Sequence, residues 1–236
     1  MGQTQHLFSS KDLSSHLEQI RWRILESIKN ETDDYICNVN EEAYIASLES
    51  HSVIEELQLF TDQSCIAWEG DREVAFESVF GGTGRRNVHH ITFAVPFAGP
   101  TWLFECRPNT FTTCPPRAEI SGNELRWTFA TENQTPEQVR SSLNAQVCSV
   151  AQYAGWVNEM VRHWNRNLRA LIQPAFRARK ERLTKGTAFA QSFGLPVRVR
   201  GASQQPIPVP VVRKHIEIAK PSTTLSANLK SFGAVN

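Results

Sequence analysis

The 236-residue sequence lacks several features that mark common classes of protein. No run of about 18 apolar residues occurs, which excludes a hydrophobic helix that spans a bilayer, so we expect no membrane association. The first twelve residues lack a basic segment followed by an apolar one, so we expect no secretory signal and a cytoplasmic location. The sequence also has no large excess of positive or negative charge, because its 25 Lys and Arg residues are balanced by 24 Asp and Glu residues. This balance excludes a globally basic nucleic-acid binder but allows a local patch of either sign.

Cysteine is scarce, and its spacing contains no C-x-x-C pair. The five cysteines are an odd number, which does not fit a complete disulfide framework. We therefore expect reduced, mostly buried thiols and neither a disulfide nor a metal site. The cysteines are Cys37, Cys65, Cys106, Cys114 and Cys148.

Motifs for catalysis and cofactor binding are absent too. The sequence has no P-loop, no dinucleotide-binding glycine pattern, no nucleophile elbow and no H-E-x-x-H, so we expect no catalytic residues and no cofactor. A loose set of carboxylates, Asp71, Glu73 and Glu105, is similar to that of a metal-dependent nuclease, but the lysine that such a site needs does not follow. We keep a nuclease as the third interpretation.

A glycine-rich loop with two arginines runs from residue 81 to residue 87. Backbone amides in such a loop can cradle an anion, so Gly82, Gly84, Arg85 and Arg86 form a candidate anion site. A plain hairpin loop explains the same composition.

What is present is a change of periodicity along the chain. In residues 1–52, apolar side chains recur every three or four positions from Leu13 to Ile28, which predicts a helix with one buried face. Ser9 or Ser10 is the expected N-cap. A second, shorter helix is expected from Glu41 to about Ser50.

Between residues 53 and 131 the period is two. β-branched and aromatic residues occur in short runs that glycine and proline turns separate, which predicts an antiparallel sheet of five or six strands. Leu125, Trp127 and Phe129 fall on one face of the last strand, so we expect them to pack on the core. The dipeptide Gly122-Asn123 predicts a tight hairpin before this strand.

Residues 132–186 carry the clearest local signal. Thr135 is a capping residue, Pro136 occupies the first helical position and Gln138 completes a capping box, so a long helix is expected to start there and to kink at Pro174. Its apolar residues recur at alternating spacings of four and three, as in a coiled coil. We call this row the seam; it consists of Leu143, Val147, Val150, Ala154, Val157, Val161, Trp164, Leu168 and Leu171, and it continues to Ala175.

The first helix is too short to cover the whole seam. We therefore expect a partner helix, contributed by a second copy of the chain, and so a homo-oligomer. Residues 187–236 form an extended tail in which prolines at positions 206, 208 and 210 alternate with apolar residues.

A row of cations also follows the long helix. It predicts contact with phosphates and salt-dependent nucleic-acid binding, or else a solvated face paired with acidic residues of the first helix and the NETDD segment at 30–34. We call this row the basic stripe; it consists of Arg162, Arg166, Arg169, Arg177 and Lys180.

Several blocks of the sequence resemble a known family in their order and spacing. The blocks are RPNTFTTCPPRAEISGNEL (107–125), AQYAGWVN (151–158), RKERL (179–183), SFGLPVRVR (192–200) and VPVVRKHI (209–216). They are similar to the amino-terminal region of bacterial multidomain proteins that carry a restriction-endonuclease-like or Toll/interleukin-1-receptor-like effector domain. The resemblance covers about residues 40–216 and implies a regulatory or sensing region in antiviral defence or stress signalling, with no catalytic residues assigned. No effector follows the last block, so we expect the effector in a separate chain, or else a truncated relative.

These patterns together predict an α+β protein, in which an antiparallel sheet packs against helices and one long kinked helix follows. The expected function is a non-enzymatic sensing and oligomerisation module that positions or regulates an effector. A nucleic-acid-binding module that uses the basic stripe stays open as the alternative.

Overall fold

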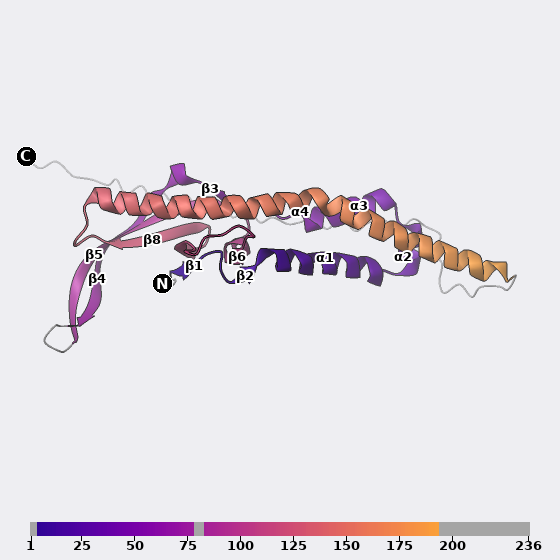
Figure 1. Ribbon diagram of the computed structural model, residues 1–236, viewed down its shortest axis with the longest axis horizontal. Coiled ribbons are helices and arrows are strands. Elements are labelled where there is room, and N and C mark those ends of the chain that lie inside the picture. The colour runs from indigo at the N-terminus through magenta and orange to yellow at the C-terminus, as the bar shows by residue number, and fades with distance from the viewer. Residues whose placement is uncertain (1–3, 78–82, 194–236) are drawn as a thin grey trace, which may run out of the picture.

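Figure 1 shows the computed structural model, which describes residues 4–77 and 83–193. An antiparallel sheet packs against helices, so the predicted α+β class is confirmed. The helices in this part of the chain are α1 (Leu13–Asn30), α2 (Asp33–Asn38), α3 (Glu41–Ser52) and α4 (Pro136–Ser192), with 3-10 turns η1 (Thr61–Gln63) and η2 (Thr101–Glu105). The strands are β1 (Gln5–His6), β2 (Lys11–Asp12), β3 (Gln58–Leu59), β4 (Cys65–Glu77), β5 (Thr83–Ala98), β6 (Cys106–Arg107), β7 (Arg117–Ser121) and β8 (Glu124–Ala130).

The sheet is organised around β5. Its strand order is β1-β7-β8-β5-β3, and β4 also pairs with β5, from Cys65 opposite Ala94 to Glu77 opposite Thr83. Strand β8 pairs with β5 only from His90 onward, so the distal part of the β4–β5 hairpin has two strands alone. We call β4 and the part of β5 paired with it the arm; it points away from the body at the end where α4 begins (Figure 1).

The inner face of the sheet follows the predicted alternation. Leu125 and Trp127 are buried, and Phe129 packs against the same cluster. The hairpin between β7 and β8 turns at Gly122, whose φ of 59° favours glycine. Both sequence predictions for this strand are therefore confirmed.

The start of α1 differs from the prediction. Asp12 is the N-cap, because its carboxylate accepts a hydrogen bond from the Ser15 amide at 2.8 Å, whereas Ser9 donates to the His6 carbonyl oxygen. Strand β2 ends at Asp12, so the helix can begin only after the strand pairing stops. An additional short helix, α2, follows α1 and is capped by Thr32.

The long helix α4 begins at the predicted capping box. The Thr135 hydroxyl accepts from the Gln138 amide at 3.3 Å, and the Gln138 side chain accepts from the Thr135 amide at 2.8 Å. The helix continues through Pro174 to Ser192, beyond the expected end at residue 186. It spans the length of the molecule and changes direction in its second half (Figure 1).

Two hydrophobic clusters lie along α4. The first joins the sheet, the N-terminal segment and η2 to Val150, Tyr153 and Val157 of α4. The second joins α1, α2 and α3 to Ile172 and Phe176 of α4, together with Leu168. One helix therefore supplies a wall of both clusters, and the sheet and the N-terminal helices pack along successive parts of it.

Two asparagines of α4 hold an extended segment that runs alongside the helix in the opposite direction. We call residues 53–57 the strap. The Asn158 side chain accepts from the Leu57 amide at 2.8 Å and donates to the Leu57 carbonyl oxygen at 2.7 Å. Asn165 makes the same pair of bonds with Ile54, at 3.0 and 2.8 Å. Each asparagine side chain thus pairs with one N–H group and one carbonyl group of the strap, which do not take part in strand pairing.

Candidate functional site

The predicted seam lies inside the monomer. Its middle residues, from Val150 to Val161, and Leu168 are buried, and the other seam residues pack half-buried against the same two clusters. The sheet covers the first half of the seam, and α1, α2 and α3 cover the second half. The seam is therefore part of the core, and its spacing gives no evidence for a partner helix. The prediction from the sequence did not consider that the sheet could cover the seam.

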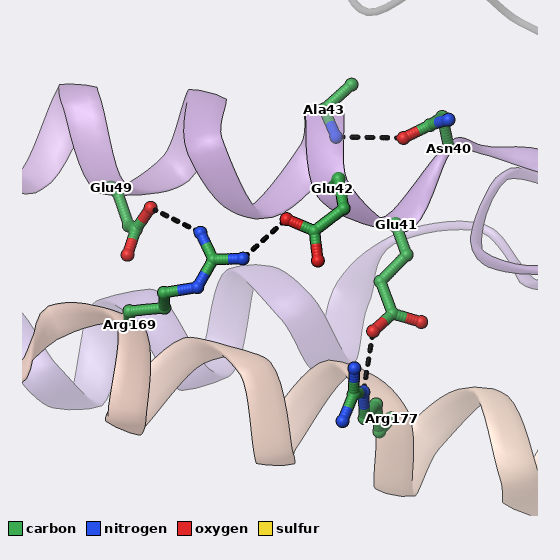
Figure 2. A network of polar contacts seen from close by, with 7 residues as sticks. All are labelled: Asn40, Glu41, Glu42, Ala43, Glu49, Arg169 and Arg177. Atoms are coloured by element: carbon green, nitrogen blue, oxygen red, sulfur yellow. Dashed lines mark hydrogen bonds and ion pairs between the residues drawn. The ribbon is translucent and has the colours of Figure 1, made fainter.

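The centre of the basic stripe faces glutamates of α3. Arg169 forms ion pairs with Glu42 and, at 3.4 Å, with Glu49, while Arg177 pairs with Glu41 at 2.6 Å (Figure 2). All these side chains are at least partly exposed, so the pairs contribute little to stability. The main effect of these pairs is electrostatic, because the glutamates neutralise the positive charges that would attract the phosphates of a nucleic acid.

The remaining stripe residues are less tightly paired. Arg162 lies 3.7 Å from Glu56, and Lys180 lies 5.7 Å from the centre of the Phe176 ring. Arg166 donates to the Arg162 carbonyl oxygen within the same helix. The acidic partners of the stripe thus lie on α3 and the strap, not on α1 or at 30–34 as the sequence suggested.

Arg179 is a buried cation with a structural role. Only 8% of its surface is exposed, and its guanidinium donates to the carbonyl oxygens of Ile28 and Glu31 and, at 3.1 Å, to Asp33. Carbonyl groups in the last turn of a helix have no hydrogen-bond partner within the helix. The guanidinium of Arg179 supplies the donors that the carbonyl groups at the end of α1 lack. Its Nε has no hydrogen-bond partner.

The three carboxylates of the nuclease interpretation are not brought together. Asp71 and Glu73 lie on β4, whereas Glu105 ends η2 and pairs with Lys11 at 2.5 Å. Within residues 4–77 and 83–193, no group of three or more His, Cys, Asp or Glu side chains is placed to hold a metal ion.

The candidate anion loop is only partly described. Gly82 lies outside the described residues, whereas both arginines lie on β5. Arg85 pairs with Glu73 at 3.3 Å and Arg86 with Glu132 at 3.1 Å. Each guanidinium already has a carboxylate partner, which opposes the binding of an added anion.

The arm exposes an apolar face. Trp68, Val74 and Phe76 are 38%, 37% and 43% exposed. The two aromatic rings lie close against glycines: a Cβ at Gly84 would be 2.6 Å from the Phe76 ring, and one at Gly70 would be 3.0 Å from the Trp68 ring. The glycines therefore let the aromatic rings lie against the backbone, so that the outer surface of each ring meets solvent.

Arginines accompany these rings. The guanidinium of Arg72 lies 4.3 Å from the centre of the Trp68 ring, and that of Arg86 lies 5.8 Å from the Phe76 ring. Arg72 Nε is buried without a hydrogen-bond partner. Aromatic side chains with arginines are the residue types that contribute most to binding in protein interfaces.

The opposite face of the arm is acidic. Glu69, Asp71 and Glu73 point to this side, because they alternate along β4 with the apolar residues. His89 of β5 bonds to Asp71 at 2.9 Å and to Glu69 at 3.3 Å. The hydrogen bond to Asp71 raises the pKa of His89 above its ordinary value of 6.5. Any stability from these contacts is present below pH 6.5 and is lost as the pH rises through the raised pKa.

A groove lies between the sheet and the start of α4. Its volume is about 820 Å³, and Ile91 and Phe93 of β5 and Leu143 and Val147 of α4 line it together with Arg140. Two seam residues thus border open space. Polar and charged side chains, among them His89, Gln134 and Glu137, line the rest of the groove.

The structure differs from the prediction that the cysteines are mostly buried. All five are free thiols, but only Cys106 is buried, while Cys37, Cys65, Cys114 and Cys148 are exposed. Burial raises the pKa of Cys106 to about 11. The expectation of mostly buried thiols is therefore wrong.

Comparisons with protein-family models, with curated proteins and with solved structures find no match for this chain. In the described part of the chain, none of the helices combines the length and the apolar character that crossing a membrane requires.

Proposed function

We propose that this chain is a non-enzymatic assembly module that uses the arm to associate with other chains and so positions an effector. The observation that carries the proposal is the uncovered apolar face of the arm. Trp68, Val74 and Phe76 are exposed on this face, whereas Ile66, which is 56% exposed, lies on the opposite face because the register shifts between Ile66 and Trp68. Large apolar side chains gathered on a projecting element are typical of protein-binding surfaces.

The effector part of the proposal rests on the sequence blocks that resemble the amino-terminal regions of effector-bearing bacterial proteins. The burial of the seam within the monomer supports the choice of the arm as the surface that associates. Most apolar residues of the seam on α4 are buried in the two clusters, so the seam is not free for partners, whereas the arm is exposed. Association through the arm needs no change in this core.

Light scattering of the purified chain tests the proposal. We expect a mass above the 26.7 kDa of one chain, with a concentration-dependent midpoint. The double variant Trp68→Ser and Phe76→Ser should shift that midpoint to at least tenfold higher concentration. Trp22→Ser is the matched control, because Trp22 is 64% exposed but lies on α1. A parent that stays at the mass of one chain at every concentration would refute self-association.

The same measurement addresses nucleic-acid binding. If the mass changes only after DNA or RNA is added, and the change weakens with salt, the basic stripe replaces the arm as the functional surface. The ion pairs of Arg169 and Arg177 with α3 argue against that outcome.

A further inference from the structure

The outer edge of β4 is open. Among the described residues β4 pairs with β5 alone, and every residue from 65 to 76 is exposed or half-buried. An edge of this length presents backbone donors and acceptors that a further strand can pair with. The edge therefore has the geometry to accept an extended segment.

The two faces of the arm define which segment fits. An added strand alternates its side chains between the same two faces. On one face it meets Trp68 and Val74, with Gly70 and Arg72 between them. On the other face it meets Glu69, Asp71 and Glu73, whose charge His89 and Arg85 of β5 neutralise in part. A matching segment has apolar and basic residues in strict alternation, because opposite charges across a strand pair are favourable and like charges are not.

A second copy of β4 does not fit this edge. Antiparallel pairing of two identical strands about Asp71 would place Asp71 opposite Asp71 and Glu69 opposite Glu73. Like charges directly opposite each other destabilise strand pairs. The acidic row thus prevents two arms from pairing with each other.

One short segment outside the described helices has the required alternation, Val197-Arg198-Val199-Arg200, since the similar runs at residues 20–24 and 176–179 belong to α1 and α4. Its position lies outside the described residues. We propose that this segment, from a second copy of the chain, adds to the open edge of β4. Val197 and Val199 then lie on the face of Trp68, while Arg198 and Arg200 lie on the acidic face.

The segment of the same chain cannot reach this edge. The arm is tied to the start of α4 by the ion pair of Arg86 with Glu132, at 3.1 Å, and α4 then runs 57 residues to Ser192. At about 1.5 Å per residue this helix is roughly 85 Å long, and the five residues from Ser192 to Val197 span at most about 18 Å. Figure 1 shows the arm beside the start of α4, at the opposite end of the molecule from the end of this helix. The contact therefore joins two copies.

A contact between the tail segment of one copy and the arm of the next is head-to-tail. It leaves one free arm and one free segment at the ends, so it propagates into chains or closes into rings. This inference rests on the proposed assembly function, and it names the two surfaces that meet.

Charge exchange tests the contact in the full-length chain. The arm variant carries Asp71→Lys and Glu73→Lys, and the tail variant carries Arg198→Glu and Arg200→Glu. In each variant alone, arm and segment have the same sign, so we expect its assembly midpoint to shift to at least tenfold higher concentration. In an equimolar mixture each arm meets a segment of opposite sign, so assembly should return. That rescue also shows that both variants are folded.

Arg23→Glu with Arg182→Glu is the matched control, because it makes the same charge change at exposed positions of α1 and α4 outside the basic stripe. It should leave the midpoint unchanged. A peptide of residues 195–203 should dissociate the parent assembly, and the same peptide with both arginines changed to glutamate should not.

The outcomes separate the two proposals. A parent that is always a single chain refutes the assembly function and this contact with it. A parent that assembles while both variants assemble equally well overturns only the contact. Variants that fail alone and also fail in the mixture overturn the contact as well.

Discussion

The strap offers a direct test of how α4 organises the chain. We predict that Asn158→Asp and Asn165→Asp each destabilise the fold, although the substitution preserves shape. Each asparagine donates one hydrogen bond to a strap carbonyl oxygen, at 2.7 Å for Asn158 and 2.8 Å for Asn165. A carboxylate cannot donate, so the carbonyl loses its partner and faces a negative oxygen instead.

The size of the effect follows from the bonds. Leaving a buried acceptor without its donor costs about 1–3 kcal/mol, and these bonds are partly buried, so we expect about 2 kcal/mol for each variant. Both asparagines hold the same five-residue strap. Once one end is released the other bond is weaker, so the double variant should cost less than the sum.

Urea unfolding followed by circular dichroism measures these changes. Asn144→Asp is the matched control, because Asn144 is exposed on α4 and should change the free energy of unfolding by less than about 0.5 kcal/mol. At acidic pH the new carboxyl group gains a proton that it can donate, so the deficit should shrink. Equal stabilities for Asn165→Asp and Asn144→Asp at neutral pH would show that the strap bonds do not hold the fold.

Three further results are expected. Arg179→Ala should lower the free energy of unfolding by about 2–4 kcal/mol, since it leaves the end of α1 without its donor, and a loss below 1 kcal/mol in urea unfolding would contradict that role. In an NMR titration the pKa of His89 should lie above 6.5 and fall in Asp71→Asn; an unchanged value would mean that the Asp71 bond does not form in solution. Gly99→Ala should destabilise the fold, because a Cβ would lie 2.5 Å from a backbone oxygen at a φ of 103°, whereas Gly155→Ala, with open space around it, should stabilise by about 0.5–1 kcal/mol; calorimetry that ranks them in the opposite order would refute this.

The parts of the fold that the sequence predicted depend on short-range chemistry. The capping box at Thr135, the turn at Gly122 and the alternation in β8 each involve residues a few positions apart. Such signals act before tertiary structure forms, so they can be recognised without it. The class, the start of α4 and the inward face of β8 therefore agree with the structure.

The parts that the sequence could not predict depend on which distant segments meet. A heptad pattern shows that one side of α4 is buried but does not show what covers it, and here the sheet and three helices do. Asn158 and Asn165 look like ordinary polar residues of a helix until the strap lies beside them. The pairing of Arg169 with α3 is equally invisible, since more than 100 positions separate the partners.

The central place of α4 has a consequence for how the protein is made. Every earlier element that packs on this helix, from Leu7 to Trp127, leaves the ribosome before the helix that covers it. Until Val161 has been synthesised the inner face of the sheet lacks its full cover, and until Phe176 has been synthesised the inner face of α1 lacks its cover. Exposed apolar surface and unpaired strands promote aggregation, so the nascent chain passes through a stage at which chaperones have a surface to bind. A sense codon changed to a stop within α4 should therefore yield insoluble protein rather than a smaller folded unit.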